Sequence, residues 1–121
     1  MIFTGTRLPV GDNSGALLVQ CIKIMSKSKY RWGSLADVAL VSVKRVRPAK
    51  RVKKKEKHRF LIVNTKLGVL RYSELLRFAT NSGVVLKKED AVPIASRVSL
   101  IAPFELRRNF RRIVTMASVN V

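Results

Sequence analysis

Short apolar runs separated by turn residues make up most of this sequence, and each run has the length of a β-strand. Between 16 and 25 both alternating faces are mostly apolar, with Ile22 and Ile24 on one face and Val19 and Cys21 on the other. That pattern is expected for a strand in a closed barrel or sandwich. The segment 73–78 is ambiguous. The pattern predicts extended segments at 1–10, 16–25, 37–46, 60–65, 69–72, 84–86 and 92–101.

Residues 11–15 (GDNSG) lie between the first two segments and are a strong turn signal, here called the first turn. Asp and Asn side chains can bond nearby backbone amides, and Gly15 can take positive φ. The β-branched runs 37–46 and 60–65 are expected to pair as a long hairpin. Pro48 lacks a backbone donor, which suits a stretch that leaves the sheet.

After Pro103 the apolar period changes from that of a strand to that of a helix. A helical segment at about 103–118 places apolar side chains on one face and four arginines on the other. The apolar face is expected to pack on the sheet, and the membrane surface is the alternative. The apolar set is Leu106, Phe110, Ile113, Val114 and Ala117. With no repeat or boundary, 1–121 reads as a single domain, with a β-barrel at about 1–102 and a basic hairpin arm at 44–59.

Positive charge is concentrated between the two strands of the expected hairpin. The basic segment, 44–59, carries ten of the 25 Lys and Arg residues, in a chain of net charge +18. The hydrophobic fraction of 47% is that of a folded domain and not of a disordered polybasic chain. The basic segment is therefore interpreted as a presented arm whose target is a polyanion. Nucleic acid is the first choice and a membrane surface the second.

Basic and aromatic residues also alternate in the loop 26–34. Tyr30 and Trp32 either stack on bases or fold back to plug one end of a barrel, and the pattern does not separate these alternatives.

Groups needed for catalysis are sparse. The one histidine, His58, lies inside the basic segment and is interpreted as a further phosphate contact. The one cysteine, Cys21, is interpreted as a small buried side chain in a reducing compartment. No metal-ligand spacing or phosphate-binding glycine motif is present in the sequence. We expect no enzyme activity, cofactor, metal or small-molecule substrate. No signal peptide, cleavable presequence or membrane span is expected.

Taken in order, the motifs resemble the large-subunit ribosomal protein L14 family. The resemblance begins with 12–16 (DNSGA) and 21–23 (CIK) and continues through 52–55 (VKKK) and 62–68 (IVNTKLG). Shorter matches follow at 77–78, 81, 84–86, 93–94, 97 and 105–107. Order and spacing hold over nearly the whole chain, so the series is specific although no single piece is.

The chain departs from the family pattern at several turns that usually contain glycine. The departures are Ala36-Asp37 for Gly-Asp, Tyr72-Ser73 near an Asp-Gly turn, Ala95-Ser96-Arg97 for Gly-Thr-Arg and Leu100-Ile101 for Gly-Pro. They resemble the drift of organellar members. A mitochondrial ribosome is therefore favoured, and a bacterial or plastid ribosome stays open.

The resemblance implies a mainly β fold: a small five-stranded β-barrel with a projecting basic hairpin and short C-terminal helices. It implies a structural constituent of the large ribosomal subunit that binds its rRNA and contributes to bridges with small-subunit rRNA. The implied protein neighbours are ribosomal proteins L19 and L3. The ribosome silencing factor is a further implied partner, with Ser96, Arg97 and the C-terminal helix as its nearest matching surface. The alternative is a free-standing OB-like nucleic-acid-binding protein, which would use aromatics on an exposed sheet face.

The candidate rRNA-binding residues are the basic side chains of the segment 44–59, the first turn and the C-terminal arginines. For each candidate residue outside the basic segment, the alternative interpretation is a turn former or a solvated charge. The set is Asn13, Ser14, Lys23, Lys44, Arg45, Arg47, Lys50, Arg51, Lys53, Lys54, Lys55, Lys57, Arg59, Lys66, Arg71, Arg97, Arg107, Arg108, Arg111 and Arg112.

Overall fold

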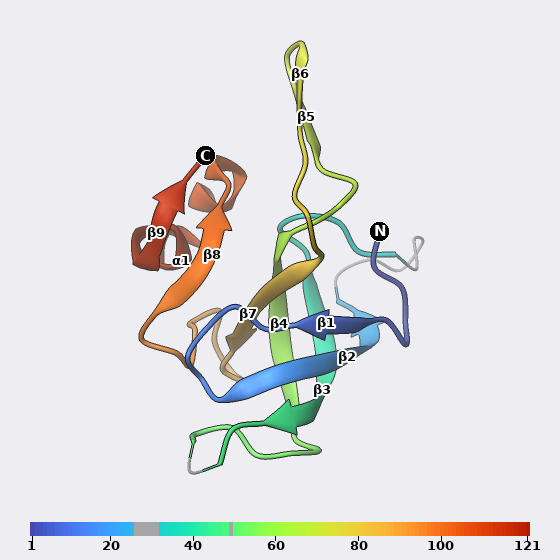
Figure 1. Ribbon diagram of the computed structural model, residues 1–121, viewed down its shortest axis with the longest axis vertical. Coiled ribbons are helices and arrows are strands. Elements are labelled where there is room, and N and C mark those ends of the chain that lie inside the picture. The colour runs from blue at the N-terminus through green and yellow to red at the C-terminus, as the bar shows by residue number, and fades with distance from the viewer. Residues whose placement is uncertain (26–31, 49) are drawn as a thin grey trace.

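One curled antiparallel sheet contains the strands predicted at 1–10, 16–25, 37–46, 60–65 and 84–86 in the computed structural model, which describes residues 1–25, 32–48 and 50–121 (Figure 1). The sheet order is β1-β2-β3-β4-β7. The sheet curls into a half-barrel, in which the amide of Gly11 donates to the carbonyl of Gly83 at 3.0 Å beside β7. The strands are β1 (Arg7–Pro9), β2 (Ala16–Ile24), β3 (Val38–Val46), β4 (Lys57–Asn64) and β7 (Ser82–Leu86).

The simple alternation predicted for 16–25 is wrong in its second half. Register shifts interrupt the pairing of β2 with β3, one of them between Cys21 and Lys23. An extra residue at such a shift reverses which side chains face inward. Val19, Cys21 and Ile24 are therefore all buried, whereas Ile22 is exposed.

Two apolar clusters use opposite faces of β4 and β7. Phe60, Ile62 and Val85 face the interior of the curled sheet. Leu61, Val63, Val84 and Leu86 face the C-terminal residues, which cover that side of the sheet. Because both faces are covered, β7 is buried along its whole length. The core therefore spans both sides of these two strands.

The ambiguous segment 73–78 contributes to a separate ribbon. β5 (Val69–Arg71) and β6 (Glu74–Leu76) pair with each other and project from the sheet (Figure 1). Tyr72 takes the turn with φ +47° and is fully exposed. The ribbon is local, since it pairs with no strand of the main sheet. Its weak pattern follows from having little core to face.

The single C-terminal helical segment predicted at 103–118 is divided. A 3-10 turn, η1 (Phe104–Arg107), precedes α1 (Arg111–Met116), and Phe110 interrupts them with the non-helical angles φ −130° and ψ 45°. Residues beyond α1 form β9 (Ala117–Asn120), which pairs in parallel with β8 (Val98–Ala102). Pairing with the β8 backbone therefore replaces the last helical turn. The extended segment predicted at 92–101 is a strand only from Val98, where β8 begins.

The predicted apolar face of this segment is nevertheless confirmed. Leu106, Ile113, Val114 and Ala117 are buried against the outer side of β4 and β7. These side chains are therefore not available to a membrane surface. Within the described ranges, no helix has the length and apolar character required to cross a bilayer.

Candidate nucleic-acid interface

The basic loop, 47–56, joins β3 to β4 and is folded against the end of the sheet. The predicted hairpin is confirmed, and its loop packs against the end of the sheet through one apolar residue. Val52, in the middle of the loop, is 2% exposed and belongs to the core cluster inside the curled sheet. Burying a valine side chain lowers the free energy of the folded state. The burial of Val52 therefore holds its charged neighbours close to the surface of the sheet.

Hydrogen bonds hold both ends of the basic loop. The amide of Arg47 donates to the carbonyl of Gly15 at 2.8 Å, and the amide of Lys55 donates to the carbonyl of Val43 at 2.9 Å. Arg51 Nη1 donates to the carbonyl of Ile94 at 2.9 Å. The loop is therefore tied to the first turn, to β3 and to the segment before β8.

Gly15 is required where the basic loop crosses the first turn. Its φ is +107°, and a Cβ on it would lie 2.2 Å from Lys50 Cβ. A side chain there would both strain the backbone and push the loop away. The glycine in the predicted turn thus allows the close approach of the loop.

Three exposed lysines, Lys53, Lys54 and Lys55, form the outer edge of the loop. Lys55 has φ +69°, a backbone region that favours glycine. Behind them Glu56 accepts from the amide of Lys53 at 3.3 Å and contacts His58 Nε2 at 2.8 Å. The His58 hydrogen bond is the main reason that the pKa of Glu56 lies below its usual value. The tip thus combines fixed backbone geometry with three cations open to solvent.

His58 does not lie on the surface with these lysines. It is 7% exposed, because the strand β4 turns this side chain inward, where it contacts Glu56. Its ring still lines a cleft beside Lys87 and Lys88, so the expectation that it makes a further phosphate contact stays a prediction.

The first turn is held from inside. Asp12 accepts from the amide and hydroxyl of Ser14 and from the amide of Val85. Burial raises the pKa of the Asp12 carboxyl. Ser14 itself is 1% exposed, so its side chain serves the turn. Asn13 Oδ1 accepts from the amides of Ser96 and Arg97, both at 3.0 Å, and Asn13 Nδ2 donates to Ser96 Oγ at 3.0 Å.

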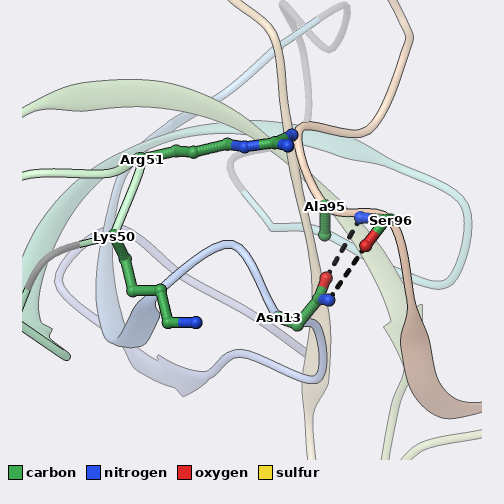
Figure 2. Close-up of a pocket in the computed structure, with 5 residues that line it drawn as sticks. All are labelled: Asn13, Lys50, Arg51, Ala95 and Ser96. Atoms are coloured by element: carbon green, nitrogen blue, oxygen red, sulfur yellow. Dashed lines mark hydrogen bonds between the residues drawn. The ribbon is translucent and has the colours of Figure 1, made fainter.

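These contacts leave a polar cleft of about 380 Å³ between the first turn and the basic loop. In Figure 2 Lys50 and Arg51 extend from the loop toward Asn13 and Ser96. Ala95 completes the lining. The sequence did not place Ala95 and Ser96 beside the first turn, because they approach it only through the fold.

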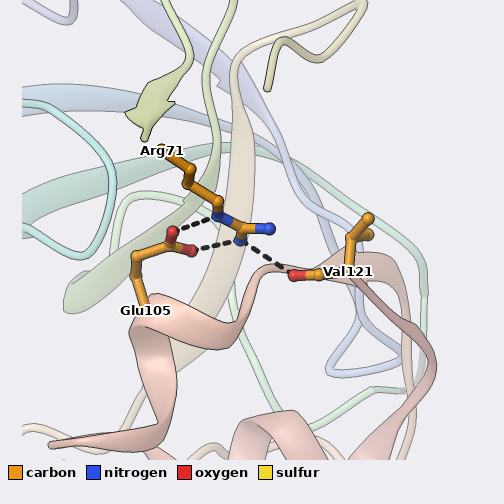
Figure 3. A network of polar contacts seen from close by, with 3 residues as sticks. All are labelled: Arg71, Glu105 and Val121. Carbon is orange, nitrogen blue, oxygen red and sulfur yellow. Dashed lines mark hydrogen bonds and ion pairs between the residues drawn. The ribbon is translucent and has the colours of Figure 1, made fainter. Parts of the chain in front are cut away.

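Arg71 occupies a different environment from the other candidate cations. Its guanidinium bonds both carboxylate oxygens of Glu105, and Nη2 also donates to the carbonyl of Val121 at 2.8 Å (Figure 3). The Arg71 hydrogen bond is the main reason that the pKa of Glu105 is lowered. Arg71, at the end of β5 next to the turn, thus ties the β5–β6 ribbon to the C-terminal segment.

The remaining candidates lie at several places on the surface. Exposed candidates are distributed over β2, the ends of β3 and β4, the turn after β4, the segment before β8, and the C-terminal segment, whereas Lys44 and Arg59 are half-buried. The exposed set is Lys23, Arg45, Lys57, Lys66, Arg97, Arg107, Arg108, Arg111 and Arg112. Lys87 and Lys88, which the sequence did not single out, line a second cleft of about 310 Å³ with His58, and their adjacency in a polar loop was the available signal.

Trp32 is half-buried and Tyr30 lies outside the described residues, so the choice between stacking and plugging stays open. Among the described residues, no three His, Cys, Asp or Glu side chains are grouped to hold a metal ion.

A curled sheet with a docked basic loop and a net charge of +18 is suited to a protein that binds a polyanion over an extended surface. The model of the family "Ribosomal protein L14p/L23e" matches residues 1–121, and the chain belongs to that family. It is therefore a protein of the large ribosomal subunit that binds rRNA, and it is not an enzyme.

Proposed function

We propose that the basic loop is the principal rRNA-binding element of this chain and that it acts as a fixed platform for backbone phosphates. The observation that carries this proposal is the burial of Val52 in the middle of the loop, beside the exposed Lys53, Lys54 and Lys55. A docked loop holds its cations in place before RNA arrives, so less conformational entropy is lost on binding. Phosphate contacts of this kind give affinity and position, whereas the bases give little.

The other exposed candidates extend the platform. Lys23, Lys66, Arg97 and the C-terminal arginines are proposed as supplementary phosphate contacts. Ser14 and Arg71 are proposed to act indirectly, Ser14 by shaping the first turn and Arg71 by holding the ribbon against the C-terminal segment. This division follows from their hydrogen bonds to Asp12 and Glu105.

Replacing Lys53, Lys54 and Lys55 together by Gln tests the principal contact. Each phosphate contact contributes about 0.7 to 0.9 to the slope of log affinity against log salt, so losing three should flatten the slope by about 2 to 3. Filter binding to large-subunit rRNA at several salt concentrations measures it. The control is Arg7→Gln with Arg77→Gln, two exposed cations outside the proposed contacts, which should leave the slope close to that of wild type. Equal slopes for the triple variant and wild type would remove the loop from the interface.

We infer further partners from the resemblance to the family. Ribosomal proteins L19 and L3 are proposed as neighbours, and bridges to small-subunit rRNA as a second contact. The ribosome silencing factor is proposed to dock near Ser96, Arg97 and α1. The exposure of Ser96 and Arg97 is compatible with such docking.

We propose that the chain belongs to a mitochondrial ribosome. The support is its departure from the family pattern at turns that usually contain glycine. Ala36 and Tyr72 keep positive φ values of 69° and 47°, so the turns persist although the glycines do not. Fractionating organelles and detecting the chain by mass spectrometry tests this proposal, and recovery in cytoplasmic or plastid ribosomes alone would contradict it.

A further inference from the structure

The cleft between the first turn and the basic loop has a composition that selects one kind of ligand. Its polar side chains come from three separate segments: Asn13 from the first turn, Lys50 and Arg51 from the loop, and Ser96 from the chain before β8. Its volume of about 380 Å³ is far larger than the space of one water molecule and lies in the range of small ligand sites.

The hydrogen-bonding capacity left in the cleft consists mostly of donors. Asn13 Oδ1 already accepts two amides, so that side chain has only an N–H left to offer. Ser96 Oγ accepts from Asn13, which leaves its hydroxyl proton free to donate. Lys50 and Arg51 carry donors only, and Arg51 uses Nη1 on the carbonyl of Ile94. The matching ligand is a group rich in acceptors.

Charge selects further among such ligands. The carboxylate of the first turn, Asp12, is not part of the cleft lining and accepts hydrogen bonds from Ser14 and from the amide of Val85. Two cations, Lys50 and Arg51, therefore face the cleft without a carboxylate in its lining. An anion that bridges Lys50, Arg51 and Ser96 would make charge-assisted hydrogen bonds, which are stronger than neutral ones.

The walls are fixed before any ligand enters. Lys50 packs on Gly15, Arg51 is held by Ile94, and Asn13 is held by Ser96 and Arg97. We propose that this cleft is a dedicated phosphate site that seats one backbone phosphate of the bound rRNA. The proposal rests on the proposed function and assigns one defined subsite within that wider basic surface.

Lys50→Gln with Lys54→Gln as its matched control tests the subsite. Both variants remove one charge from the same loop, but only Lys50 lines the cleft, and Gln keeps the Cβ and Cγ atoms that pack on Gly15. We expect Lys50→Gln to weaken binding to large-subunit rRNA about tenfold and Lys54→Gln about twofold at equal salt. Ser96→Ala, which changes no charge, should weaken it by about threefold. Thermal unfolding confirms that each variant is folded.

NMR with inorganic phosphate supplies the second readout. Phosphate should shift the Arg51 Nε–H and Ser96 amide signals in wild type and in Lys54→Gln. It should not shift them in Lys50→Gln. Equal losses of rRNA affinity in Lys50→Gln and Lys54→Gln, with wild type still binding, would overturn the subsite and leave the proposed function standing. Phosphate shifts without the rRNA difference would show a site for free phosphate only, which also overturns the proposal. A wild-type chain that does not bind rRNA would overturn both.

Discussion

Shortening Val52 tests whether docking of the basic loop matters to RNA binding separately from its charge. Val52→Ala removes two methyl groups from a side chain that is 2% exposed in the core. At about 0.8 kcal/mol for each buried carbon group, plus a term for the remaining cavity, the loss is about 2 kcal/mol. Because Val52 lies in the loop, its truncation should destabilise the docked conformation of the loop before the rest of the fold.

We expect the free energy of unfolding, measured in urea, to decrease by about 2 kcal/mol. The affinity for large-subunit rRNA should fall about three- to tenfold, because part of the binding free energy must then reorder the loop. The salt slope should stay unchanged, since no cation is removed.

Val63→Ala is the matched control, because it removes the same atoms from the other core cluster, on the side covered by the C-terminal segment. It should cost comparable stability and leave rRNA affinity unchanged. If Val52→Ala weakens rRNA binding no more than Val63→Ala does, the docked conformation is irrelevant to binding and the platform interpretation is refuted.

Two further predictions concern strain and pH. Lys55→Gly should stabilise the fold by about 0.5 to 1 kcal/mol, because glycine relieves the strain of the positive φ of 69°. Lys54→Gly removes the same charge and should not stabilise the fold. Urea unfolding measures both variants, and equal effects would show that Lys55 is unstrained. The pKa of Glu105 is lowered chiefly by its hydrogen bond with Arg71, so the pair stabilises the folded state above the ordinary carboxyl pKa of about 4.3. That contribution is lost as pH falls through the lower pKa of the folded state. Wild type should therefore lose more stability than Glu105→Gln between pH 7 and 3, and parallel pH curves would contradict this.

The parts of the fold that the sequence predicts best are those with strong local patterns. The paired strands β3 and β4 follow from β-branched runs, and the burial of Leu106, Ile113 and Val114 follows from their spacing. The basic segment was identified by its charge alone. Its docking was not, because Val52 is a single apolar residue among lysines and its contacts come from distant parts of the chain.

The features that the sequence did not predict depend on tertiary competition. The register shift in β2 reverses the side-chain faces without any local signal at Ile22. The break at Phe110 depends on β9 finding the β8 backbone. The contact of Asn13 with Ser96 spans 83 residues, so the cleft exists only once the sheet has closed. Local periodicity carries no information about such pairings.

A map of the large ribosomal subunit that contains this chain tests the account most directly. The account predicts rRNA phosphates against the exposed face of the basic loop, within hydrogen-bond distance of Lys53, Lys54 or Lys55, and one phosphate in the cleft beside Lys50. A basic loop that faces solvent or protein, with rRNA only on other faces of the chain, would contradict the central claim.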